Sequence, residues 1–306
     1  MTTTLTGSNH FLVQAELRKL VKAFVAEHTE MGLQRFDGEE AEYDQIREAL
    51  ESLPFLASKK LVVLRNPSAN KEFVARAEQL LANLPDSTDL IIHEPKLDKR
   101  SVYYKYLRKH TTYKEFNELE EAGLIKWLCE QAKSQGGNLD SSVARYLIER
   151  LGPNQQLLHS ELAKLLAYNP SVSRPSIDLL TEPTPQSTIF QLLDAAFAGN
   201  PKKALKIYQE QRAGKTEPLA IIGMLAWQLH IVALIVVASQ RSDAEIAQQA
   251  KISPYVVRKS RQIARELSLA QVRQLISRLL ELDLSIKTTS IDADDALQTY
   301  LLNIST

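Results

Sequence analysis

The first 116 residues alternate between two spacings of apolar residues. Short apolar runs predict strands, and longer segments with apolar residues three and four positions apart predict amphipathic helices. The expected strands lie at residues 5–7, 33–36, 61–64, 90–93 and 112–116, and the expected helices at 11–27, 43–53, 71–83 and 102–109. Strands that alternate with helices of this size indicate a mostly parallel sheet with helical crossovers. We therefore expect an α/β domain over residues 1–117.

Beyond residue 117 the pattern has the spacing of helices alone. Helices are expected at 124–134, 141–151, 154–168, 189–198, 201–212, 217–239, 243–250, 254–266, 270–287 and 292–302. The segment 171–185 contains three prolines and is the best candidate for a domain boundary. The sequence thus predicts three domains: the α/β domain at 1–117, a small helical domain at 118–182 and an all-α domain at 183–306.

Composition narrows the class of protein. The 306 residues carry 37 basic and 37 acidic side chains, a balance that argues against a free-standing nucleic-acid binder and fits a subunit that contacts other proteins. The single cysteine, Cys129, excludes an internal disulfide and suits a reducing cytoplasm. The most apolar stretch, 221–238, is interrupted by Gly223, Gln228 and His230, so we expect a buried helix and no membrane association.

Nucleotide chemistry is the first function that an N-terminal α/β domain suggests. Gly7 lies between the first strand and the first helix, where a phosphate-binding loop would continue as Gly-x4-Gly-Lys-Ser/Thr. The three required positions are Leu12, Val13 and Gln14, which cannot cradle a phosphate or hold its metal. The strand that ends at Glu94 offers one acid where a magnesium site needs a pair. We expect no ATP hydrolysis by this chain.

The sequence shows no other pattern that is typical of a catalytic or metal site. The six histidines show no HxH, HxxxH or Cys/His spacing, so the sequence predicts no metal site, no catalytic residue and no cofactor.

Two basic segments could contact nucleic acid. Residues 96–109 hold six basic side chains and three tyrosines, which could neutralise phosphates and stack on bases. The favoured interpretation is a solvated helix that packs Val102, Tyr106 and Leu107 inward. Residues 242–265 scan like a helix-turn-helix, with Lys251 in place of the usual turn glycine and Pro254 opening the second helix. Sequence-specific DNA binding through 242–265 is therefore the alternative function, although a helix pair within a larger bundle explains the pattern equally well.

One stretch stands out as a candidate contact for a partner. Ile46, Ala49, Leu50 and Leu53 form an apolar stripe on one helix, which Pro54 stops. The pair Phe55-Leu56 follows, then a polar break, two lysines and a strand. Such an apolar end either fills a core or binds a partner.

The chain as a whole resembles the delta subunit of the bacterial DNA polymerase III clamp loader. No single motif is specific, and the resemblance rests on several segments in the right order along nearly the full length: 5–12, 52–64, 96–100, 161–165, 199–205, 254–259 and 282–287.

The resemblance implies a fold, partners and a role. The α/β domain would be a degenerate AAA+/RecA-like module without ATP chemistry, 118–182 a helical lid, and 183–306 a helical collar that holds a five-subunit ring together. The partners would be the sliding clamp (beta), the gamma or tau subunits and the delta-prime subunit, with primed DNA contacted indirectly. The chain would bind and open the clamp in the cytoplasm as part of the DNA polymerase holoenzyme, without nucleotidyl-transfer chemistry of its own.

The resemblance also assigns site residues. The clamp-binding segment would be Leu53, Pro54, Phe55 and Leu56, which we call the tip. Phe55 and Leu56 are the strongest candidates, because Leu53 could instead belong to the core-facing stripe of its helix. The candidate DNA-contacting residues are Lys99, Arg100, Arg258 and Lys259.

Overall fold

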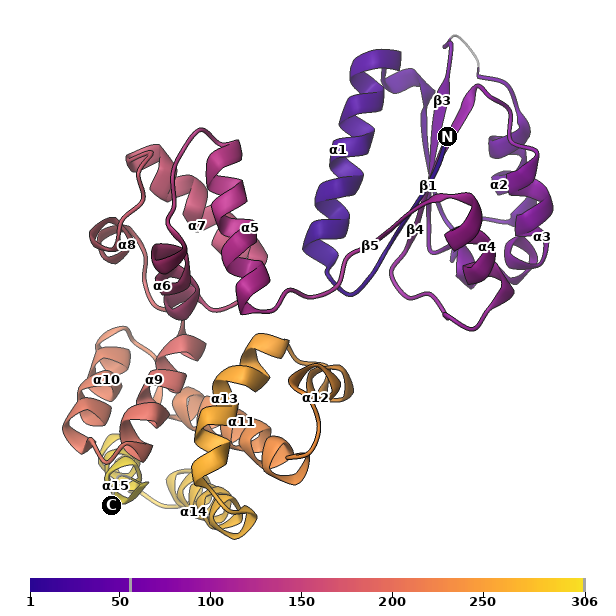
Figure 1. The fold of residues 1–306 in the computed structure, drawn as a ribbon. Helices are drawn as coiled ribbons and strands as arrows, with labels where there is room; N and C mark the ends of the chain where they lie inside the picture. Colours follow the sequence, from indigo (N-terminus) through magenta and orange to yellow (C-terminus); the bar gives the residue numbers. More distant parts are fainter. Residues whose placement is uncertain (55–56, 305–306) are drawn as a thin grey trace. The chain divides into compact units, whose positions relative to one another are not determined.

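The structure is a computed structural model that describes residues 1–54 and 57–304, and it comprises two compact units (Figure 1). Unit 1 is Met1–Glu118 and unit 2 is Leu119–Thr306. The division of unit 2 into a lid and a collar stays a prediction.

Unit 1 is built on a parallel sheet of five strands in the order β2-β3-β4-β1-β5. The strands are β1 (Thr2–Thr6), β2 (Leu33–Asp37), β3 (Lys60–Arg65), β4 (Thr88–Glu94) and β5 (Thr112–Glu115). The helices are α1 (His10–His28), α2 (Tyr43–Glu51), α3 (Lys71–Ala82) and α4 (Val102–His110), with short 3-10 turns η1 (Glu30–Gly32) and η2 (Pro67–Ala69). The predicted α/β fold is confirmed, and the element ends differ from the predicted ones by a few residues.

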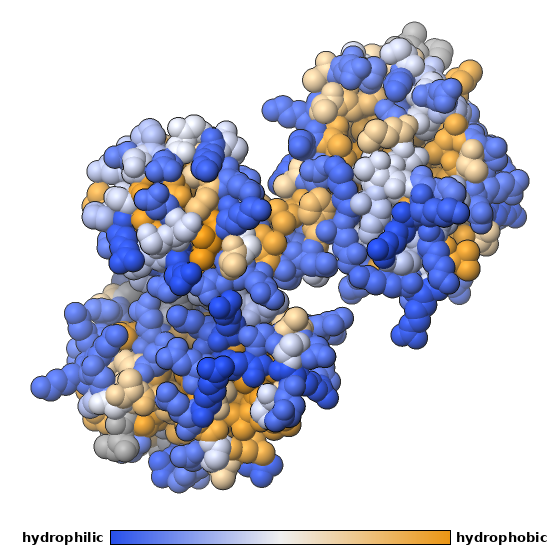
Figure 2. Space-filling model, in the orientation of Figure 1, coloured by the Kyte–Doolittle hydropathy of each residue, from blue (hydrophilic) through white to orange (hydrophobic). Residues whose placement is uncertain are grey.

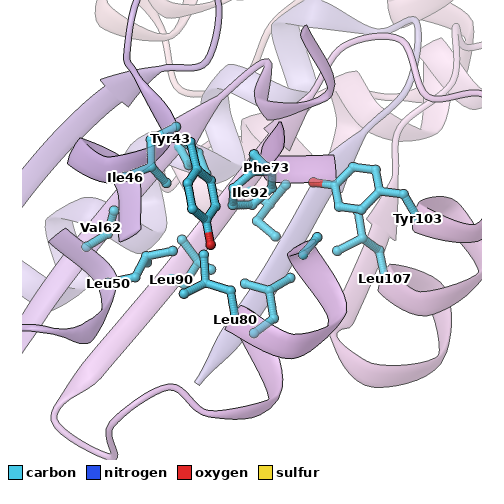
Figure 3. Close-up of a cluster of buried hydrophobic side chains, with 13 residues drawn as sticks. Tyr43, Ile46, Leu50, Val62, Phe73, Leu80, Leu90, Ile92, Tyr103 and Leu107 are labelled. Atoms are coloured by element: carbon cyan, nitrogen blue, oxygen red, sulfur yellow. The ribbon is translucent and has the colours of Figure 1, made fainter. Parts of the chain in front are cut away.

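Helices cover both faces of this sheet, with α1 on one face and α2, α3 and α4 on the other (Figure 1). Successive strand residues point to opposite faces. Val62 and Leu64 of β3 therefore join the cluster that contains Ile46 and Leu50 of α2, shown in Figure 3. Leu61 and Val63 join the cluster beneath α1. Burial on both faces explains why the central strands read as continuous apolar runs.

Unit 2 is helical. Its helices are α5 (Glu121–Ser134), α6 (Ser141–Leu151), α7 (Gln155–Tyr168), α8 (Arg174–Leu180), α9 (Pro185–Phe197), α10 (Pro201–Ala213), α11 (Pro218–Val237), α12 (Asp243–Ala250), α13 (Pro254–Glu266), α14 (Leu269–Thr288) and α15 (Ala293–Ile304). Helix α11 contacts α9, α13, α14 and α15. It has the length and composition of a membrane span, yet nearly half of its apolar window is buried among these helices.

One helix was not expected from the sequence. The segment 171–185, predicted as a proline-rich boundary, contains α8. Ser173 caps this helix, accepting a hydrogen bond from the backbone of Ser176. Pro175 lies in the first turn, where a missing N–H costs nothing because that position has no partner within the helix. The proline therefore starts a helix here.

Candidate functional site

The turn between β1 and α1 is closed by its own chain. Gly7 has φ +119°, and a Cβ placed there would lie 2.0 Å from the carbonyl oxygen of Phe116. The Asn9 N–H donates to that same oxygen at 2.9 Å, and Ser8 Oγ accepts from the Glu118 N–H at 3.2 Å. The Asn9 side chain accepts from the Leu12 N–H.

A phosphate-binding turn needs free amides at the start of the helix. Here the segment 116–118 lies beside the turn, and its Phe116 carbonyl takes the Asn9 amide at the start of the helix. Val13, at the position where the motif needs a lysine, belongs to α1 and is buried on the face of that helix that packs on the sheet. The missing motif residues are one argument against phosphate binding at this turn, and its geometry is a second.

The single acid at the end of β4 has a structural role. Glu94 is fully buried and accepts hydrogen bonds from the Ser68 N–H and hydroxyl, both at 2.7 Å, which fasten η2 to the sheet. Burial raises the pKa of Glu94 to about 7, and the Ser68 hydrogen bonds oppose that rise. Among the described residues, no group of three or more His, Cys, Asp or Glu side chains gathers as a metal site would.

The end of α2 shows where the tip begins. Ile46, Ala49 and Leu50 are buried as the stripe predicts, but α2 ends at Glu51 and not at residue 53. Ser52 is extended and Leu53 is 76% exposed. Leu53 therefore does not belong to the core, because the helical spacing no longer applies once the chain has left the helix. Pro54 is half-buried, and Phe55 and Leu56 lie outside the described residues.

A buried lysine, Lys60, lies where the segment after α2 enters β3. The sequence pattern had not marked it as a functional residue. The Lys60 ammonium donates to the carbonyl oxygens of Ala49 and Ser52 and to Ser52 Oγ. A signal was present in the sequence, since strand alternation places Lys60 on the same face as Val62 and Leu64, toward α2. The neighbouring Lys59 is instead partly exposed, near Asp89.

The basic segment 96–109 packs differently from the prediction. Val102 was expected inside but is 74% exposed, whereas Tyr103, Tyr104 and Leu107 are buried. Tyr103 and Leu107 are four positions apart and lie on one side of the helix, so the inner face of α4 is centred about one residue later than predicted. Tyr106 packs against the core at its edge, as expected.

The candidate DNA-contacting residues of unit 1 differ in their surroundings. Lys99 pairs with Glu115 at 2.8 Å, and Arg100 is exposed. Neither position alone defines a nucleic-acid interface.

The helix-turn-helix-like segment is part of the bundle. Helices α12 and α13 form a pair whose turn places Lys251 at φ +56°, where glycine is usual. The apolar face of α13 is buried against α9, α11 and α12. Arg261 pairs with Asp243 at 2.5 Å, and Arg258 lies 4.0 Å from Glu121. Lys259 is partly buried and faces Asp194. Burial raises the pKa of the Asp194 carboxyl. The basic side chains thus have acidic neighbours, which favours a structural role.

Unit 1 thus combines a parallel α/β fold with a closed β1–α1 turn, and unit 2 is helical. Two family models match this chain: "DNA polymerase III, delta subunit" over residues 4–117 and "DNA polymerase III delta subunit, C-terminal domain" over residues 186–304. Together they cover more than half of the sequence. The chain therefore belongs to the family of DNA polymerase III delta subunits, the clamp-loader subunits of DNA replication.

Curated relatives and a solved structure agree with this assignment. The chain is 23% identical to the DNA polymerase III subunit delta of Bacillus subtilis, over 98% of its own length and 91% of the relative's. It is 25% identical to the subunit delta of Escherichia coli, over 80% and 74% of the two lengths. The solved Bacillus subtilis DNA clamp loader delta protein has the same fold, with a TM-score of 0.85, 22% identity and coverage of 99% and 95%.

Proposed function

We propose that this chain binds the sliding clamp through the tip and holds the clamp open for loading onto primed DNA. The observation that supports the proposal is the exposure of Leu53, directly after a helix whose other apolar positions are buried. A large apolar side chain that the core does not use, followed by two more in the sequence, is the chemistry of an anchor for a hydrophobic pocket.

The tip can supply enough binding energy for this role. Burying a leucine or phenylalanine side chain on a partner contributes about 1.5–3 kcal/mol each, so a few anchors dominate an interface. Opening a ring requires only that the tip bind the open clamp more tightly than the closed one. No chemical step in this chain is needed, and ATP would act on other subunits.

The tip begins away from the turn at which an active ATPase binds its nucleotide. The end of α2 and the start of β3 lie at the edge of the sheet where its parallel strands begin (Figure 1). The closed β1–α1 turn lies at the opposite edge, where the strands end. Clamp contact would therefore use a surface distinct from the one that binds nucleotides in an active ATPase.

The other partners would contact unit 2. Helix α14 exposes Ile276, Leu280 and Leu284 at a spacing of four residues, which places them on one side of the helix. Trp227 of α11 is partly exposed and lines an apolar pocket of about 380 Å³ with Ile189 and Met224. Figure 2 shows apolar residues exposed among polar ones on this unit. We assign these surfaces to contacts with the gamma or tau and delta-prime subunits of a cytoplasmic five-subunit loader.

A direct binding measurement tests the proposal. The double variant Phe55→Ala, Leu56→Ala should lose at least about a hundredfold in clamp affinity by surface plasmon resonance, since two anchors are truncated. Val102→Ala is the matched control, because Val102 is as exposed as Leu53 but lies on α4. The proposal fails if the double variant binds the clamp like the wild type while the thermal melts coincide.

A further inference from the structure

The C-terminal end of α2 is held by the first residues of two neighbouring strands. The last carbonyl groups of a helix have no partner within it and must find one elsewhere. Here Ala49 O accepts from the Lys60 ammonium, and Leu50 O accepts from the Thr88 hydroxyl at 3.4 Å. Lys60 and Thr88 are paired across β3 and β4, so the edge of the sheet caps the helix.

Lys60 makes the larger part of this cap. The residue is only 2% exposed, and its ammonium also reaches Ser52 O and, at 3.0 Å, Ser52 Oγ. A buried ammonium is tolerated only when hydrogen bonds replace its water, and the negative end of a helix favours it further. Burial lowers the pKa of Lys60. A methionine would fill the same space at lower desolvation cost. We therefore expect the Lys60 ammonium to have a specific role.

That role concerns the segment that Lys60 closes. Ser52 is the last residue before the tip, and Lys60 is the first residue of the strand after it. One side chain therefore ties the two ends of the segment 53–59 together. Among the described residues of this segment, the other polar contacts are longer: Ser58 Oγ lies 3.5 Å from His28 Nδ1, and Lys59 lies 3.8 Å from Asp89.

We propose that Lys60 is a positioning residue for the tip, whose hydrogen bonds to Ala49 and Ser52 fix the place and direction in which the chain leaves α2. The inference rests on the proposed clamp-binding function. Pro54 restricts Leu53 to extended conformations, so a fixed Ser52 carries its orientation into the tip. A preorganised anchor loses less conformational entropy on binding than a loose one.

The test uses the full chain with Lys60→Met, which keeps the length of the side chain and removes its donors. Clamp affinity should fall about tenfold, because the tip must then be ordered on binding. Asn70→Ala is the matched control: Asn70 caps α3 through the Phe73 N–H, at the opposite edge of the sheet. It should lower the melting temperature without changing clamp affinity.

Coupling between the anchor and the tip separates positioning from general destabilisation. In the Lys60→Met background, Phe55→Ala with Leu56→Ala should cost less affinity than in the wild type, since the tip is already loose. Loss of folded protein would instead reduce binding by the same factor in both backgrounds. Additive effects, or unchanged affinity of folded Lys60→Met, overturn the inference.

A milder variant covers the case in which Lys60→Met does not fold. Ser52→Ala removes one of the ammonium's acceptors at an exposed position and should weaken clamp binding about threefold. Wild-type affinity of Ser52→Ala then refutes the positioning role. If the tip double variant itself binds normally, the proposed function fails; if only Lys60→Met and Ser52→Ala bind normally, the function stands and the positioning role is wrong.

Discussion

The buried acid at the end of β4 makes the stability of unit 1 depend on pH. The folded state keeps the Glu94 proton up to about pH 7, whereas the side chain in an unfolded chain loses it near its ordinary value of 4.5. Between these values the folded state binds more protons, so the free energy of unfolding falls as the pH rises. The favourable contribution is complete below pH 4.5 and is lost by the time the pH passes about 7.

The size of the effect follows from the shift. One pKa unit corresponds to about 1.4 kcal/mol, so the change from 4.5 to about 7 is worth about 3 kcal/mol. Glu94→Gln removes the titration but keeps an amide oxygen that can accept from the Ser68 N–H. Relative to the wild type, the variant should therefore gain about 3 kcal/mol in stability as the pH rises from 4.5 to 7.5.

The measurement must report on unit 1 alone, because both tryptophans, Trp127 and Trp227, lie in unit 2. Urea unfolding at a series of pH values, followed by a hydrogen-exchange pulse at one fixed pH, reports on peptides that contain β4. His93 titrates in the opposite sense, since burial lowers its pKa, but it is present in both proteins and cancels in the difference. Parallel pH profiles for the two proteins would show that Glu94 is already ionised in the folded state.

Two further changes test the closed turn and the surface of unit 2. Gly7→Ala should destabilise unit 1 by about 3 kcal/mol or more, because the new Cβ meets the Phe116 carbonyl at a positive φ; a loss below about 1 kcal/mol in the same urea experiment would mean that segment 116–118 moves away freely. Leu280→Asp on the exposed stripe of α14 should reduce co-purification with the other clamp-loader subunits while leaving clamp affinity of the isolated chain unchanged. Full recovery of the complex with Leu280→Asp would exclude the α14 stripe as a subunit contact.

Local patterns in the sequence were sufficient to predict the α/β fold of unit 1 and the helical character of unit 2. Apolar spacing follows directly from the geometry of strands and helices, so the alternation in residues 1–116 defines a parallel sheet with helices on both faces. Leu12, Val13 and Gln14 depart from the phosphate-loop motif by residue type alone, which predicts that the loop chemistry is absent. Helix α8 was missed for a local reason as well, since Pro175 stops or starts a helix depending on where the cap lies.

Only the tertiary structure shows which of these residues are exposed and which contacts fix the backbone beside them. Periodicity alone left Leu53 between core and tip, and only the end of α2 at Glu51 places it outside the core. Lys60 caps α2, and segment 116–118 packs against Gly7. Both contacts join positions that no local sequence pattern connects. Such contacts depend on the order of strands in the sheet, which brings distant parts of the chain to one edge. The sequence alone thus determined an apolar segment beside two lysines, and the fold determined that one of them, Lys60, is buried and donates to the carbonyl groups of Ala49 and Ser52.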